Sequence, residues 1–186
     1  GFGSLSSIPG STIAALTFST EIRGDGSGGV PFWASTLLPA CGFVNAGGVF
    51  SPVTEAPGAN VKTLTMSSYQ DGIIKTLTGA AGTVQFVFEA GKHVMANWTF
   101  TGKFTSIADG STLTGVTRPS TKPIVLAGQP ILIGGASASC INNITIDSGN
   151  NVVARPCANE AGAIEAGLIT DRKVTATLDP ESVLVA

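Results

Sequence analysis

The sequence predicts a mainly β fold: an antiparallel β-sandwich or partly closed barrel with one short α-helix. Apolar and polar residues alternate along several stretches, which is typical of strands with one buried face. The chain contains 24 glycines, and threonine and valine are frequent, which favours turns and strands over helices. Residues 31–41 change instead to a helical period.

The composition fits a single domain with little surface charge. The 186 residues are enough for a substantial core, and a hydrophobic fraction of 43% excludes a disordered chain. We therefore take residues 1–186 as one domain. Charged residues make up 12% of the chain, against roughly 25% in a typical globular domain. Coverage by other copies of the chain explains this, and an exposed sheet rich in threonine and serine explains it equally well.

The bulk properties also exclude some classes of function. The net charge of −2 provides no basic surface for specific nucleic-acid binding. The sequence has no run of 18 apolar residues, so it predicts no membrane span. Nothing in it resembles a signal peptide.

The centre of the predicted sheet is a hairpin formed by residues 83–89 and 94–104. A three-residue loop, residues 89–91 with Gly91 in the left-handed conformation, keeps both apolar rows on one face. This register predicts three facing pairs: Phe88 with Lys92, Phe86 with Val94, and Val84 with Ala96.

A second hairpin joins residues 61–68 to residues 73–78 through Asp71-Gly72, a strong type I′ turn signal. Its register sets Met66 opposite Leu77 and Ser67 opposite Thr76. The apolar face comprises Leu64, Met66, Ile73 and Leu77. The hydroxyl face, left for water, a neighbour or a lumen, comprises Thr63, Thr65, Ser67, Thr76 and Thr78.

The other predicted elements are short, apart from a long strand at residues 12–23. The helix at residues 31–41 starts with Pro31, is weakened by Pro39 and ends before Gly42. Further strands are predicted near residues 49–53, 124–126, 131–133, 140–147, 152–155 and 168–178, and at the C-terminal Leu184-Val185-Ala186.

The predicted connections are residues 4–11, 24–29, 43–60, 148–150 and 158–162. In the strand at residues 140–147, Ile144 and Ile146 are expected to face inwards, and residues 152–155 return after the turn. Residues 105–122 have no periodicity and are long for a loop in a compact domain, which suggests function or contact with a neighbour.

No catalytic, cofactor-binding or metal-binding constellation is predicted. His93 is the only histidine, so a hydrolase triad or a typical zinc site lacks partners, and His93 is expected to be a strand-end surface residue. Asp171-Arg172-Lys173 is expected to form a structural pair within the sheet or between subunits. Asp109-Gly110-Ser111 and Glu160 are expected to be solvated loop residues. Gly24-Asp25-Gly26 lacks the strand-to-helix setting of a phosphate-binding loop.

Three residue types have structural interpretations. Asn97 and Asn143 begin glycosylation sequons, but both lie in predicted strands. Trp33 and Trp98 are expected in the core. The cysteines predict free, mostly buried thiols of a protein assembled in the cytosol, with a bridge between the last two as the alternative: Cys41, Cys140 and Cys157.

The run DGIIKTLTGAAGTVQFVFEAGKHVMANWTFTGKF, residues 71–104, resembles the middle of the tail tube (major tail) proteins of long-tailed bacteriophages. That family has a DG turn, "LTGA-GTV", an alternating strand, an "AG" turn and a strand closing on "F-F-G-F". Residues 167–182, GLITDRKVTATLDPES, are similar to its "ITDRKP-G-…-PE" pattern. Weaker matches are LLPACGF at residues 37–43 and "D-GN-VV-R" at residues 147–155. Together they follow the family's order and cover most of the chain.

The resemblance implies a structural virion protein and no enzyme or cofactor. Members of this family form hexameric rings in which sheet edges close into an inner β-barrel, and the rings stack into a hollow tube for DNA. It implies other tail proteins as partners at the tube ends, a place in the phage tail, and assembly in the host cytoplasm. Family members extend further at both ends, so a partial chain is an expectation.

On this basis, residues 61–78 and 83–104 are expected to line the tube, and residues 24–29 and 105–122 to reach neighbouring rings. Two alternatives stay open. One is a secreted adhesin or carbohydrate-binding β-sandwich. The other is a capsid decoration or tail-completion protein.

Overall fold

The computed structural model describes residues 10–53, 61–138 and 140–181. In order, its elements are β1 (Ile13–Glu21), α1 (Phe32–Ala40), β2 (Phe43–Ala46), β3 (Val49–Pro52), β4 (Leu64–Gln70), β5 (Ile73–Glu89), β6 (Met95–Asp109), β7 (Leu132–Ile133), β8 (Ala136–Ser137), β9 (Ile141–Asp147), β10 (Asn150–Pro156), β11 (Ile164–Arg172) and β12 (Thr175–Pro180). The strands pair antiparallel, and their sheets stay open rather than closing into a barrel. The predicted mainly β class with a short helix is confirmed.

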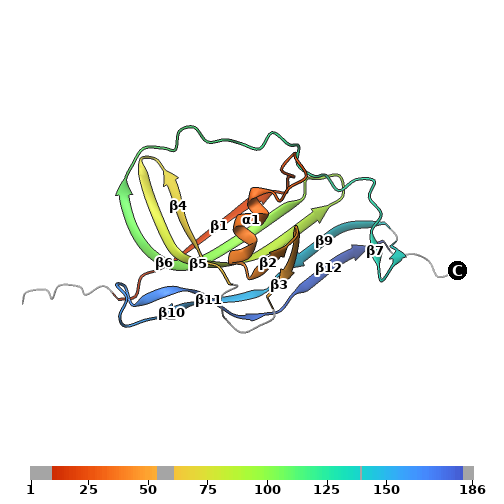
Figure 1. Cartoon of the computed structure of the whole chain (residues 1–186). Helices are drawn as coiled ribbons and strands as arrows, with labels where there is room; N and C mark the ends of the chain where they lie inside the picture. The colour runs from red at the N-terminus through yellow and green to blue at the C-terminus, as the bar shows by residue number, and fades with distance from the viewer. Residues whose placement is uncertain (1–9, 54–60, 139, 182–186) are drawn as a thin grey trace, which may run out of the picture.

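The main sheet has the strand order β1-β6-β5-β9-β12, and β4 also pairs with β5. The first half of β5 pairs with β4 and the end of β6, whereas its second half pairs with the start of β6 and with β9. A register shift between Thr78 and Ala81 separates the halves. In Figure 1, β4 and the adjoining ends of β5 and β6 curve up and away from the rest of the sheet.

A second layer comes from a bent ribbon near the C-terminus. β9 pairs with β12, and β10 pairs with β11, so the two pairs form one ribbon with a bend at Ser148-Gly149. Gly149 has φ +58°, and a Cβ there would overlap the carbonyl oxygen of Lys173, so the bend requires glycine. Beyond it, β10 and β11 leave the sheet and run below β5 and β6 in Figure 1, while α1 lies above.

The core lies between the sheet and α1. Trp98, Phe100 and Val84 are fully buried, and α1 adds Ala34, Leu37 and Leu38. The ring of Trp33 lies 6.4 Å from that of Trp98. Both indole N–H groups have acceptors, because Trp98 Nε1 donates to Thr20 Oγ1 and Trp33 Nε1 to the Arg23 carbonyl, each at 2.8 Å. The predicted core positions of both tryptophans are confirmed.

The hairpin between β4 and β5 forms as the sequence predicts. Asp71 and Gly72 have φ of +48° and +77°, as a type I′ turn requires. Met66 faces Leu77 and Ser67 faces Thr76, whose hydroxyls lie 3.2 Å apart. This register is confirmed.

The register predicted for the hairpin between β5 and β6 is wrong by two residues. Val84 faces Trp98 and Phe86 faces Ala96. Gly91 does have a positive φ of +74°, but the loop runs from Ala90 to Val94 because a later segment bonds to it: Val94 N–H donates to the Ile124 carbonyl at 2.9 Å. A shift of two residues preserves the faces of the sheet, so the prediction of one apolar face holds.

Other boundaries differ because strands continue wherever a partner is available. Residues 105–109 belong to β6, since they pair with the first half of β5. Residues 43–46 form β2 against β3 instead of a plain connection. Residues 152–155 lie within β10, which pairs with β11 and does not return along β9. The strand predicted at residues 168–178 is split between β11 and β12 by the ribbon's bend.

Smaller differences from the predicted elements concern the helix, two segments near the sheet and the residues outside the described ranges. The helix starts at Phe32 with Pro31 as its N-cap, and Pro39 lies in its last turn. Residues 124–126 make only isolated bridges. Ile146 is 37% exposed, not buried. The predicted loop at residues 4–9, connection at 54–60 and strand at Leu184-Val185-Ala186 lie outside the described residues.

Candidate assembly surface

One face of the main sheet is polar across five strands. Sheet pairing places side chains of β1, β6, β5, β9 and β12 in continuous rows on the side away from α1. None of them is buried. This polar face comprises Thr17, Ser19 and Glu21; Met95, Asn97 and Thr99; Thr83, Gln85, Val87 and Glu89; Asn143, Thr145 and Asp147; and Thr175, Thr177 and Asp179.

Side-chain hydrogen bonds run along these rows. Ser19 Oγ donates to Asn97 Oδ1 at 2.7 Å, and Asn97 Nδ2 donates to Gln85 Oε1 at 3.4 Å. In the same row Gln85 faces Asp147, which faces Thr175. The alternation of residues in β1, β5 and β6 predicts their part of this face. The parts in β9 and β12 are not predicted from sequence, although Asn143-Thr145-Asp147 and Thr175-Thr177-Asp179 carry the same period-two signal over short runs.

Every charged residue of the polar face is acidic: Glu21, Glu89, Asp147 and Asp179. Cations lie just beyond two of them. Arg23 Nε donates to Glu21 Oε2 at 2.9 Å, and this hydrogen bond lowers the pKa of Glu21. Lys92 Nζ lies 2.6 Å from Glu89 Oε1. The face is therefore neutral to weakly acidic.

Two strands end the main sheet with one unpaired side. β1 pairs only with β6 and β12 only with β9 among the described strands. Unpaired strand edges recruit other chains unless something protects them. β1 and β12 are thus candidate bonding edges.

The structure brings together the two segments predicted to contact neighbours. Thr121 Oγ1 donates to the Gly24 carbonyl at 2.7 Å, and Arg23 Nη1 donates to the Thr121 carbonyl at 2.6 Å. Asp25 organises residues 24–29 by accepting from the N–H groups of Gly28 and Gly29 at 3.0 and 2.8 Å. A bond from the Ser27 hydroxyl contributes most to lowering the pKa of Asp25.

The remaining predicted site residues have structural surroundings. His93 is exposed in the loop just before β6, with Nδ1 3.7 Å from Glu21 Oε1. Glu160 lies in a loop and accepts from Lys103 Nζ at 2.9 Å. Asp109 is the last residue of β6 rather than a loop residue. Asn97 and Asn143 lie within β6 and β9.

The Arg172 guanidinium does not bond to Asp171, whose Oδ1 accepts instead from the Arg172 backbone N–H at 2.7 Å. Its guanidinium donates through Nε to Asn150 Oδ1 at 2.7 Å and through Nη2 to the carbonyls of Cys41 and Gly42 at 2.8 and 2.9 Å. It also lies 4.9 Å from the ring centre of Phe43. Burial lowers the pKa of Arg172. Arg172 thus joins the ribbon to the end of α1, a link that the sequence did not indicate.

The three cysteines are free, as the main prediction has it, and no bridge joins Cys140 to Cys157. Their burial is uneven: Cys41 is buried, Cys157 is half-buried and Cys140 is exposed. Burial raises the pKa of the Cys41 thiol to about 12, opposed by the nearby charge of Arg172.

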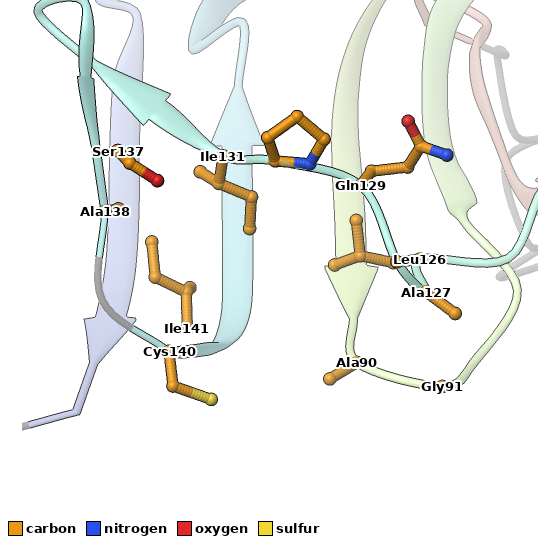
Figure 2. Close-up of a pocket in the computed structure, with 12 residues that line it drawn as sticks. Ala90, Gly91, Leu126, Ala127, Gln129, Ile131, Ser137, Ala138, Cys140 and Ile141 are labelled. Carbon is orange, nitrogen blue, oxygen red and sulfur yellow. The ribbon is translucent and has the colours of Figure 1, made fainter.

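A groove of about 410 Å³ lies between the turn joining β5 to β6 and the start of β9. Figure 2 shows Ile131 and Ile141 on one side of it and Leu126 and Ala90 on the other. None of its lining residues is charged. Across the described ranges no three metal-ligating side chains cluster, and no described helix has the length and hydropathy of a membrane span.

The fold and this surface define a class of protein: a β-sheet subunit with one extended polar face and, among the described strands, two unpaired edges. A family model for the phage tail tube protein matches residues 5–181 of the chain, so the chain belongs to the phage tail tube family. It is thus a structural protein of the bacteriophage tail. No curated protein matches the chain.

Proposed function

We propose that copies of this chain join edge to edge into rings, that the rings stack into the tail tube, and that the polar face lines the lumen through which DNA passes. The resemblance described above supports a hexameric ring, a single domain over residues 1–186, and a role without catalysis. On this proposal, assembly takes place in the host cytoplasm, and other tail proteins bind at the tube ends.

The polar face is the observation that carries this proposal. It extends across five strands and reaches both open edges of the sheet, so edge-to-edge joining would continue it around a ring. Apart from Met95 and Val87 it presents hydroxyls, amides and acids, and it contains no lysine or arginine. Because phosphate neutralisation by cations dominates non-specific DNA binding, such a wall lets DNA pass without holding it.

The first test is electron microscopy of the purified protein, in which stacked rings with a central channel are expected. Tubes of the double variant Gln85→Lys/Asn97→Lys should then retain labelled double-stranded DNA, and wild-type tubes should not. The comparison variant, Thr65→Lys/Ser67→Lys, places the same charges on β4, which the sequence also assigns to the tube lining but which lies outside the polar face. DNA retention by tubes of the comparison variant alone would contradict the assignment of the polar face to the lumen.

The second test concerns ring stacking. Residues 110–122 contain exposed apolar side chains, Leu113 at 55% and Val116 at 62%, and they contact residues 24–29 through Thr121. Replacing residues 112–116 with glycine and serine at equal length should leave single rings that do not elongate. Tubes of unchanged length would show that this segment does not form the stacking contact.

A further inference from the structure

We propose that the ring closes by a parallel pairing of β1 of one copy with β12 of the next, and that Leu178 of the neighbouring copy packs against Phe32 beside β1. This inference rests on the ring proposed above. It names the two edges, their relative direction and the side chains that meet.

The pairing of β1 with β6 shows which backbone N–H and C=O groups of β1 are left to bond to another strand. Ile22 N–H donates to the Val94 carbonyl at 2.9 Å, in register with the pairs between β1 and β6. In an antiparallel pair, hydrogen-bonded and non-bonded residues alternate. Even-numbered residues of β1 therefore bond to β6, and the N–H and C=O groups of Thr17, Ser19 and Glu21 point away from the sheet. These residues carry the side chains of the polar face.

In β12 the odd residues, not the even ones, bond within the sheet. Lys173 N–H donates to the Gly149 carbonyl at 3.0 Å, in register with Thr175 facing Asp147. Odd-numbered residues of β12 therefore bond to β9. The free backbone groups belong to Ala176 and Leu178, whose side chains lie on the α1 side. Pro180, which has no N–H, ends this free edge.

These patterns exclude an antiparallel junction. In an antiparallel junction, an odd residue of β1 and an even residue of β12 would lie directly opposite each other as a hydrogen-bonded pair. Polar side chains of β1 and apolar side chains of β12 would then lie on the same side of the joined sheet. In a parallel junction the hydrogen bonds are staggered, so each odd residue of β1 lies opposite an odd residue of β12, and the polar side chains of both strands stay on one side of the sheet. The directions of the two strands also require a parallel junction. In a sheet of five antiparallel strands β1 and β12 run the same way, and cyclic symmetry repeats that direction in every copy.

A groove beside β1 provides room for the incoming side chains. It measures about 860 Å³, and the edge residues Ser19 and Thr20 lie beside it. Its lining combines apolar side chains with charged ones: Pro31, Phe32, Trp33 and Pro119, and Glu21, Arg23, Asp25 and Arg118. The Phe32 side chain is 78% exposed and that of Leu178 is 38% exposed. Because Thr20 and Leu178 both lie on the α1 side of their strands, the parallel junction brings Leu178 of the neighbour into this groove. Exposed apolar surface of this kind is typical of a protein contact.

Disulfide formation between paired cysteine substitutions in assembled rings tests the junction. The background is Cys140→Ser/Cys157→Ser, which leaves the buried Cys41. Ser19→Cys is combined with Thr175→Cys, Thr177→Cys or Asp179→Cys, all on the polar face. At least one of these pairs should give covalent ladders on a denaturing gel. Ser19→Cys with Ala176→Cys, whose side chains lie on opposite faces, is the matched control and should stay monomeric on the gel.

The outcomes separate this inference from the ring itself. If neither the wild-type protein nor the cysteine background forms rings, the proposed function fails, and the junction fails with it. If rings form but none of the polar-face pairs cross-links, or if only the Ala176→Cys control does, the ring stands and the parallel junction is overturned. Leu178→Asp should abolish rings while the circular dichroism spectrum stays unchanged. The control Val49→Asp, at a position 65% exposed on β3, should leave rings intact.

Discussion

Arg172 and Asn150 are joined by a 2.7 Å hydrogen bond from Nε to Oδ1, and both side chains donate to the same carbonyl at the end of α1. Asn150 Nδ2 and Arg172 Nη2 each lie 2.8 Å from the oxygen of Cys41. A cation at a helix C-terminus is favourable, because it satisfies carbonyls that lack helical partners. The pair fixes the helix against the start of the bent ribbon, and so fixes the relation between the two layers.

Arg172→Lys should destabilise the subunit even though it keeps the charge. A lysine ammonium cannot reach Asn150 and two carbonyls in the planar arrangement of the guanidinium. Since hydrogen bonds to charged groups contribute about 1.5–3 kcal/mol each, we expect the free energy of unfolding to fall by about 2–4 kcal/mol in urea titrations of the monomer. The control is Lys173→Arg at the exposed neighbouring position, and equal stabilities of both variants and wild type would argue against this role.

Gly167→Ala should weaken the contact between β11 and the main sheet. An added Cβ would overlap the backbone carbonyl oxygen of Thr101 and lie 3.0 Å from Ala81 N, and backbone atoms cannot rotate away. Overpacking of this kind costs typically about 1–3 kcal/mol. Gly24→Ala is the matched control, because a Cβ there meets nothing within 4 Å. Thermal unfolding should separate the two variants, and an unchanged melting temperature for Gly167→Ala would contradict the close approach.

Local signals carried most of the successful predictions from sequence. Asp71-Gly72 specifies its turn type through two positive φ angles, and that turn sets the register of β4 on β5. Alternation assigned the faces of β5 and β6 correctly even though the predicted loop was too short, because a shift of two residues preserves parity. Faces are therefore more robust to error than registers.

The failures involve partners that are distant in sequence. Arg172 bonds to Cys41 across 131 positions, and no pattern near either residue indicates it. β5 is one strand of 17 residues shared by two hairpins, whereas the sequence predicts two separate strands at residues 73–78 and 83–89. The sequence predicts the polar face in β1, β5 and β6 but not its extension over β9 and β12, because these strands are short and a period of two is weak evidence over so few residues.

Trp98→Ala should be among the most destabilising single changes. Trp98 is fully buried, packs against Trp33, Phe86 and Phe100, and donates to Thr20. Truncating a buried aromatic side chain costs about 3–5 kcal/mol. Phe32→Ala, at an exposed position, should change monomer stability by less than about 0.5 kcal/mol. A loss below about 1 kcal/mol for Trp98→Ala in chemical denaturation would show that the core lies elsewhere.

The Cys41 thiol should make stability fall with rising pH. Its pKa rises from 9.0 to about 12 on folding because the fold buries it. Above pH 9 the unfolded chain loses this proton while the native state keeps it, so the stabilisation present below pH 9 is lost as pH rises towards 12. The slope from one such group is about 1.4 kcal/mol per pH unit.

Cys41→Ala isolates this contribution from the other groups that titrate at alkaline pH. The difference in unfolding free energy between wild type and Cys41→Ala should shrink by about 2 kcal/mol between pH 9 and 10.5. In the native protein at pH 8, exposed Cys140 should react with a thiol reagent and Cys41 should not, because the thiolate is the reactive form. A pH-independent difference between the two proteins, or rapid labelling of Cys41, would mean that the thiol is open to solvent and that the α1 end is not sealed by Arg172 and Asn150.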